Sequence, residues 1–154
     1  MVCDKIILVI LRKVRCQGGS MPIDVTYSNQ GAGVILVGRE TVTGPDLLQA
    51  DDVMYESEEK IKKMRFILSD YTRVTATTLE QAELTLSIQK DKAAARINPD
   101  IVIAVVTGKE ITYGVSRMWQ ILGEIHEYPW KEFTTRSLSE AKNWITEQTG
   151  LEVI

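Results

Sequence analysis

A chain of 154 residues, 44% hydrophobic and 25% charged, has the composition of a single soluble globular domain and not that of a fibrous or disordered protein. Its net charge is −3, and because the first 20 residues are mainly basic, the rest of the chain is still more acidic. An acidic body without a cationic stripe excludes nucleic acid as a partner. The apolar run near the start, residues 6–11, is too short to cross a bilayer, so we expect no transmembrane segment.

The beginning of the chain differs from the rest of the sequence. We interpret residues 1–20 as an extension, mis-started or disordered, in front of a natural start at Met21, and residues 21–154 as one domain. The alternative is an added edge strand over residues 6–14. Both cysteines lie in this first segment, where they cannot frame the fold of the remaining chain. This indicates a reducing compartment and a cytoplasmic protein.

The next stretch predicts a β-hairpin and then a helix. Hydrophobic and polar residues alternate over residues 23–28, as in a half-buried strand. A turn over residues 29–33 then leads to a second strand over residues 34–37. Thr43-Gly44-Pro45-Asp46 has the residues of a helix entry, and residues 47–62 are predicted to be helical with an unclear middle.

Two continuous apolar runs, residues 66–68 and residues 101–106, predict strands that are covered on both faces. Between them, residues 79–97 are the strongest helix prediction, with Asn98-Pro99 as the stop. The apolar residues expected on its buried face are Leu79, Ala82, Leu86, Ala93 and Ile97.

The end of the chain predicts two more helices with a short strand between them. The first covers residues 111–125, and the strand covers residues 133–135. A capping box, Ser137 to Glu140, opens the last helix, and Gly150 closes it. The residues expected on the buried face of the helix over residues 111–125 are Ile111, Val115, Met118, Leu122 and Ile125.

The order of elements therefore predicts an α/β fold. Strands that alternate with helices imply parallel pairing and right-handed crossovers. We expect a mixed, mostly parallel sheet of about five strands, with an N-terminal β-hairpin and four helices.

The segment "SDYTRVTATT", residues 69–78, places many hydroxyl groups after a buried strand. We interpret it as a strand end, a loop and a helix start, because Thr77 and Thr78 begin two overlapping capping boxes. The alternative is a modified or anion-binding loop, since helix N-termini attract phosphate.

This order of elements and several short motifs resemble the STAS family, the SpoIIAA-like anti-sigma-factor antagonists and their STAS/SEC14-like relatives. Gly38-Arg39-Glu40 is similar to the family's strand end, and "TYGVSRMWQ" and "RSLSEAKNWI" are similar to two helices of the STAS/SEC14-like group. The segment "SDYTRVTATT" stands where the family carries its phosphorylated Ser. The resemblance covers about residues 22–147 and implies a SpoIIAA/STAS-like fold.

The chain departs from the family at the phosphorylated position. Aligning Asp70 with the start of the family motif places Leu79 where the antagonists have Ser, and leucine has no oxygen to accept a phosphate. The resemblance therefore does not carry over the partner switch by kinase and phosphatase, although Thr77 or Thr78 remain alternative acceptors.

Asp70, Lys109, Tyr113 and Arg117 are the first candidates for a binding site. Asp70 comes after a buried strand, and the other three come after the next strand, so all four are expected at the carboxyl edge of the sheet, where α/β proteins bind ligands. The alternative is a solvated rim with a salt bridge. Trp130, after a proline in a loop, is the aromatic residue expected to be exposed and hence a candidate contact.

Other motifs argue against catalysis and metal binding. "TGKE" lacks the upstream Gly and the Ser or Thr of a phosphate-binding loop, and the single histidine, His126, has no nearby ligand partner. The acidic group around Asp51 and Asp52 lacks the Gly and the spacing of a calcium loop, so we interpret it as a solvated face. We expect no catalytic residues, no metal and no cofactor.

These observations lead to two hypotheses about function, and no residue set argues for an enzyme. The first is a non-catalytic regulatory module that binds another protein through a helix face and the Asp70 to Thr78 loop. The second is a small-molecule or lipid-binding module of the SEC14-like kind, with an apolar cleft near Tyr113, Met118 and Trp119. The sequence leaves a homo-oligomer open.

Overall fold

The computed structural model describes residues 22–154. The predictions about residues 1–20, Met21 and the two cysteines therefore lie outside the described residues. In the described part, no helix has the length and hydrophobicity that a membrane crossing requires.

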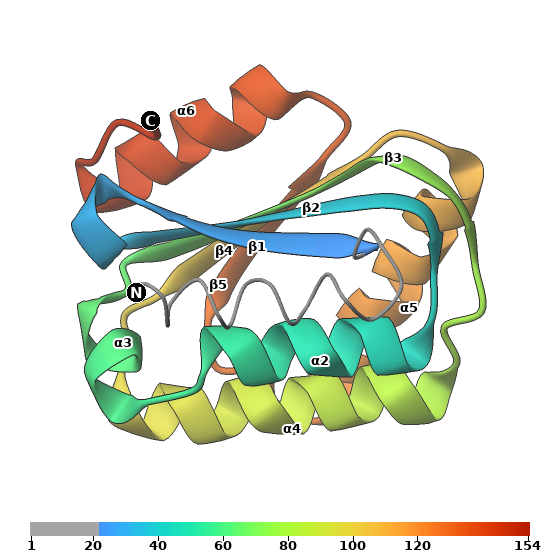
Figure 1. The fold of residues 1–154 in the computed structure, drawn as a ribbon, viewed down its shortest axis with the longest axis horizontal. Helices are drawn as coiled ribbons and strands as arrows, with labels where there is room; N and C mark the ends of the chain where they lie inside the picture. Colours follow the sequence, from blue (N-terminus) through green and yellow to red (C-terminus); the bar gives the residue numbers. More distant parts are fainter. Residues whose placement is uncertain (1–21) are drawn as a thin grey trace, which may run out of the picture.

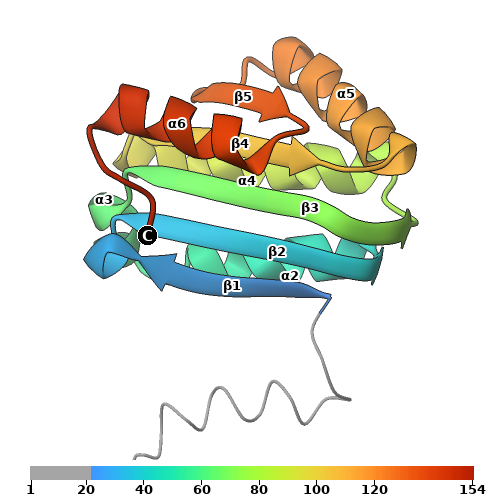
Figure 2. The ribbon, with the colours of Figure 1, turned by 90° about the horizontal axis from the view of Figure 1, so that it is seen from above.

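One mixed sheet of five strands forms the centre of the fold (Figures 1 and 2). The strands lie in the order β1-β2-β3-β4-β5; β1 and β2 form an antiparallel hairpin, and every later neighbour is parallel. Their bounds are β1 Ile23–Ser28, β2 Gly33–Val42, β3 Phe66–Thr77, β4 Val102–Thr107 and β5 Lys131–Thr135.

Helices cover both faces of this sheet. In Figure 1, α2 and α4 lie below the sheet and α6 lies above it, while α5 packs beside α4 on the lower side. The bounds are α2 Gly44–Met54, α3 Glu58–Lys63, α4 Gln81–Ile97, α5 Glu110–Ile125 and α6 Leu138–Thr149, with a short 3₁₀ turn, η1, at Asn29–Gly31.

Two hydrophobic cores result from the alternation of side chains along the central strands. In β3, Phe66 and Leu68 point to the side of α6, whereas Ile67 points to the side of α2, α4 and α5. In β4 every residue is buried, which confirms the prediction that the run over residues 101–106 is covered on both faces.

The predicted fold class is confirmed: the sheet is mixed and mostly parallel, with the hairpin at its start. Residues 22–154 form five α-helices where four were expected, because the predicted helix over residues 47–62 is divided in two. α2 ends at Met54, and the Ser57 hydroxyl accepts a hydrogen bond from the Lys60 N–H to begin α3.

The segment over residues 69–78 is mostly strand, not loop. β3 continues to Thr77, where it still pairs in parallel with Val42 of β2. The physical reason is that β-branched and aromatic residues fill this stretch, and these side chains suit a half-buried pleated surface.

The prediction that Thr77 and Thr78 cap the next helix was wrong. α4 begins after Glu80, whose N–H donates to the Glu83 carboxylate at 2.9 Å. The Thr77 hydroxyl instead donates to the Val42 carbonyl at 2.9 Å and accepts from the Leu79 N–H at 3.1 Å. Thr77 therefore joins the end of β3 to β2, while Thr78 is exposed.

The predicted inner faces of two helices also need correction. Leu86 of α4 is exposed, and the buried positions of that helix are Leu84, Ser87, Ile88, Asp91, Ala94 and Ala95. On α5, Ile111 and Ile125 are exposed, and the buried positions include Thr112 and Ser116. Apolar spacing misplaced these faces because polar residues occupy part of the true inner side.

Candidate functional site

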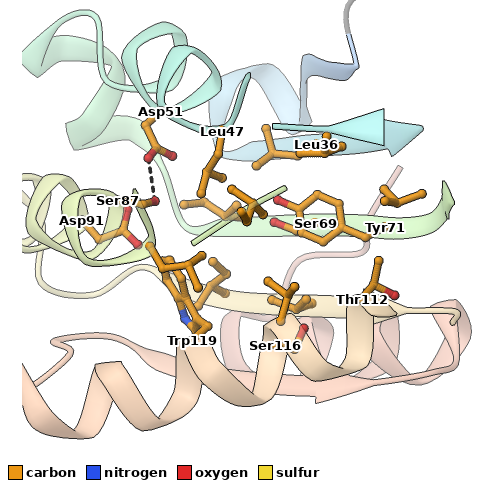
Figure 3. A pocket seen from close by; sticks show the side chains of 18 of the residues that line it. Leu36, Leu47, Asp51, Ser69, Tyr71, Ser87, Asp91, Thr112, Ser116 and Trp119 are labelled. Atoms are coloured by element: carbon orange, nitrogen blue, oxygen red, sulfur yellow. Dashed lines mark hydrogen bonds between the residues drawn. The ribbon is translucent and has the colours of Figure 1, made fainter. Parts of the chain in front are cut away.

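An internal cavity lies between the sheet and the helices α2, α4 and α5 (Figure 3). It holds about 90 Å³ of free space. Its walls are mainly aliphatic, with side chains from β2, β3, β4 and the three helices, among them Leu36, Leu47, Ile67, Leu84, Ile103 and Val115. A cavity of this kind favours a small ligand with an apolar body.

Carboxyl groups interrupt these apolar walls at one end of the cavity. Asp51 on α2 and Asp91 on α4 both line it, and each is only 3% exposed. The Ser87 hydroxyl, one turn before Asp91, donates a 2.6 Å hydrogen bond to Asp51 Oδ2. This bond joins α4 to α2 through the interior, as Figure 3 shows.

Two tyrosines hold the second carboxylate in place. Tyr55 donates to Asp91 Oδ1 at 2.6 Å, and Tyr128 donates to Asp91 Oδ2 at 2.8 Å. Asp51, Ser87, Asp91, Tyr55 and Tyr128 together are called the carboxyl cluster below. Because hydrogen bonds fix both carboxylate oxygens of Asp91, this side chain is held in one orientation in the lining of the cavity.

Burial shifts the pKa values of these groups. Loss of water raises the pKa of Asp91 to about 7, against the lowering effect of its two tyrosine hydrogen bonds. Burial also raises the pKa of Asp51 well above its usual range, and the negative charge of Asp91 raises it further. Two buried acids that repel each other are the kind of perturbed pair found at functional sites.

No cation in residues 22–154 forms an ion pair with either acid. Lys90 is the cation whose charge reaches Asp51, and its ammonium group is bonded to the exposed Asp52 at 2.7 Å. Nor do these residues bring together three side chains that could hold a metal ion. The carboxyl cluster therefore lacks a counter-charge within the described chain.

Several oxygen atoms in the cavity remain free to bind. Within residues 22–154, no donor bonds the second carboxylate oxygen of Asp51, which points toward the cavity in Figure 3. The Tyr71 hydroxyl lies beside Ser69 in the middle of the lining. Burial raises the pKa of Tyr71, and the Asp51 charge raises it further, so the phenol stays protonated as a donor.

Trp119 closes the cavity from α5, next to a third acid. Its indole N–H is buried and has no acceptor in hydrogen-bond geometry within the described residues, and Glu132 Oε2 is buried there without a donor. Burial raises the pKa of Glu132, and the nearby Trp119 indole lowers it in part. The Trp119 and Tyr128 rings pack in a T-shaped arrangement, with centroids 5.5 Å apart, which connects α5 to the carboxyl cluster.

The structure does not join the four residues expected at the sheet edge into one site. The Asp70 carboxylate accepts from the N–H and hydroxyl of Thr72, at 3.0 and 2.7 Å. Lys109 is exposed just before α5. Tyr113 lies under the Arg136 guanidinium, 4.9 Å from its ring centre, and Arg117 contacts Gln120.

Trp130 is not an exposed contact residue, which corrects the prediction. It is 4% exposed, its indole donates to the Asn98 carbonyl at 3.1 Å, and its ring packs near Tyr55 and Tyr128. Its large aromatic ring fills space beside the two tyrosines of the carboxyl cluster.

The carboxyl cluster was missed in the sequence, and Asp51 was assigned to a solvated face. One signal was available: Ser87 and Asp91 fall in the helical stripe of Leu84, Ile88 and Ala95. Polar residues in an apolar stripe indicate buried hydrogen bonds.

No protein-family model matches the chain, and no curated protein matches it significantly. Among solved structures, it is similar to an uncharacterized protein of the DUF3478 family from Shewanella loihica, described as having a SpoIIAA-like fold. The identity is 14%, the TM-score is 0.47, and the match covers 80% of this chain and 91% of that chain.

Proposed function

We propose that this domain is a binding module for a small, mainly apolar molecule, which is held in the cavity between the sheet and α5. The observation that supports this function is the cavity itself, with aliphatic walls and a few buried polar groups at one end. Binding sites for small molecules combine these two features.

The size of the cavity limits the ligand. An apolar cavity of roughly 150 Å³ accepts benzene, so a space of about 90 Å³ suits a smaller body or the end of a longer chain. Half-buried lining residues such as Leu79 and Val115 mark where the cavity comes close to the surface. A longer ligand would extend in that direction.

Leu79 supports this function over a phosphorylation switch. It occupies the position that the resemblance matches to the phosphorylated Ser, and its side chain lines the cavity. An aliphatic side chain at this place adds apolar wall to a binding space and offers no oxygen to a kinase.

The test is a titration of methyl-labelled protein with xenon and with 1-butanol, monitored by NMR. We expect saturable shifts at cavity methyl groups, such as those of Leu36, Ile103 and Val115. Ser116→Leu should suppress these shifts, because the added methyl groups fill the cavity from α5. Ser139→Leu, at an exposed position of α6, is the matched control and should leave them unchanged. Shifts that persist in Ser116→Leu would refute the proposed function.

A regulatory, protein-binding role is the second candidate. The observation in its favour is an exposed ridge along α5, where Tyr113, Arg117, Ile121 and Ile125 succeed one another at four-residue spacing. Ile121 is 53% exposed and Ile125 is 65% exposed, so the end of the ridge offers apolar area to a partner.

The ridge can be tested by affinity capture from the native cell extract. If α5 binds a protein, the double variant Ile121→Asp and Ile125→Asp should lose a partner that the unchanged chain retains. Leu138→Asp, at an exposed position of α6, is the control. Equal recovery of the partner by all three chains would exclude this surface.

A further inference from the structure

We propose that the ligand of the cavity carries a protonated amine, which donates hydrogen bonds to Asp51 and is held by the combined negative charge of Asp51 and Asp91. This inference rests on the proposed function and names the chemical class of the molecule that fills the cavity. The body of such a ligand would lie against the aliphatic walls, with the amine at the carboxyl cluster.

The first argument is charge. Asp51 and Asp91 are buried, and no ion pair within residues 22–154 neutralises either of them. Burying a charged carboxylate without a partner is unfavourable, so these two acids by themselves favour at least one protonated carboxyl group. A cation that enters the cavity supplies the missing counter-charge and lets both acids ionise. An anionic ligand would instead meet two like charges.

The second argument is the supply of free acceptors. Asp51 uses one oxygen for the Ser87 hydroxyl, and its other oxygen points into the cavity. Ser116 lines the same space from α5, is 8% exposed, and its hydroxyl has no hydrogen bond to any described residue. A protonated amine has three donors, and the free oxygen of Asp51 can accept one of them, while Ser116 and Tyr71 add polar groups elsewhere in the lining.

The third argument is rigidity. Asp91 is held by Tyr55 and Tyr128, and Asp51 by Ser87, so neither carboxylate needs to reorganise when the ligand enters. A preorganised charge binds more strongly than one that must first be ordered. Neither tyrosine can itself neutralise an acid, because a phenol is uncharged when protonated and negative when ionised. Burial raises the pKa of both phenols, so they remain uncharged donors to Asp91.

Binding of an amine should depend on pH. The groups that face Asp91 are Asp51 and Tyr55 from the α2 side, Tyr71 from β3, and Tyr128 and Glu132 from the β5 side. None of them is a cation, so the amine would be the positive charge that favours ionised Asp91, in addition to the tyrosine hydrogen bonds. Since the pKa of Asp91 is about 7, the Kd for an amine should fall about tenfold between pH 6 and pH 8. An alkylamine stays protonated throughout this range, as lysine does.

The experiment compares n-butylamine with 1-butanol, which have the same apolar body, by NMR titration at pH 8. We expect the amine to bind at least about tenfold more tightly than the alcohol. Asp51→Asn keeps an acceptor for the Ser87 hydroxyl. It should abolish the preference for the amine without weakening the binding of 1-butanol. Asp52→Asn removes an exposed carboxylate one residue away and is the matched control, which should keep the preference.

The outcomes separate the two proposals. If 1-butanol binds in the cavity as tightly as the amine, or if Asp51→Asn keeps the preference, the amine inference is wrong and the proposed function stands. If neither compound shifts the cavity methyl groups, the proposed function itself fails. The pH profile of the unchanged protein tests the inference without any variant: an amine Kd that is equal at pH 6 and pH 8 would overturn it.

Discussion

The Ser87 hydroxyl on α4 donates a 2.6 Å hydrogen bond to the Asp51 carboxylate on α2, in the interior of the domain. One turn further along α4, Asp91 is bonded by Tyr55 and Tyr128. The two helices are thus joined by a polar contact in a region that is otherwise packed with aliphatic side chains. Such a contact is stabilising only while its partners stay satisfied, and this makes the carboxyl cluster sensitive to pH and to substitution.

The stability of the protein should depend on pH through Asp91. Its pKa is raised by burial from 3.8 to about 7 in the folded state, so the folded protein retains a proton that the unfolded chain releases. The contribution of Asp91 to the free energy of unfolding is therefore largest below the pKa that this residue has in the unfolded chain. It falls as pH rises from about 4 to 7, and it is constant at higher pH. Relative to Asp91→Asn, the unchanged protein should lose about 3 kcal/mol between pH 5 and pH 8.

Urea unfolding at both pH values measures this difference. Asp100→Asn, which changes an exposed acid, is the control and should retain the loss seen in the unchanged protein. If Asp91→Asn shows the same pH dependence as the unchanged chain, Asp91 is not the group that titrates.

Tyr128→Phe should weaken the carboxyl cluster. The substitution removes a 2.8 Å hydrogen bond to Asp91, and at pH 8, where the carboxylate is charged, we expect a loss of about 1.5–3 kcal/mol in the free energy of unfolding. At pH 5 the acid is neutral and the loss should be nearer 1 kcal/mol. Tyr113→Phe, on an exposed ring, serves as the comparison, and a loss as large as that of Tyr128→Phe would count against this assignment.

Thr77→Ala and Thr78→Ala should differ although the residues are neighbours. The Thr77 hydroxyl makes two hydrogen bonds at the end of β3, to the Val42 carbonyl and from the Leu79 N–H, so its loss should cost about 1–2 kcal/mol. Thr78 is exposed, and the effect of its change should stay within about 0.5 kcal/mol. Thermal unfolding of the two variants measures both losses of stability. A larger loss for Thr78→Ala than for Thr77→Ala would support a helix-capping role for Thr78.

Trp130→Ala should destabilise the domain by about 3–5 kcal/mol, because it removes a buried ring from behind the carboxyl cluster and leaves the Asn98 carbonyl without its donor. Ile125→Ala removes an apolar side chain that is 65% exposed, so it should change the free energy of unfolding little. Urea midpoints that are equal for the two variants would show that Trp130 does not contribute to the core.

Local patterns predicted the strands of the sheet well. The apolar run over residues 101–106 became a fully buried strand, and the alternation over residues 23–28 became β1 of the hairpin, although Tyr27 on its apolar face is exposed. The same reasoning failed on α4, because Ser87 and Asp91 lie on its buried face and Leu86 on its exposed face. A spacing rule that counts only apolar residues cannot locate an inner face that is partly polar.

Taken by itself, the sequence determined the alternation of strands and helical segments and with it the mixed α/β fold, although it did not separate α2 from α3. The reason is that hydrophobic periodicity is local and reflects burial residue by residue. The tertiary structure alone decided which polar side chains meet. The hydrogen bonds of the carboxyl cluster connect residues 36 or 37 positions apart, so they form only when α2, α4 and the segment after α5 pack on the same face of the sheet. Because of this packing, Asp51, which the sequence assigned to a solvated face, is a buried acid in the lining of an apolar cavity.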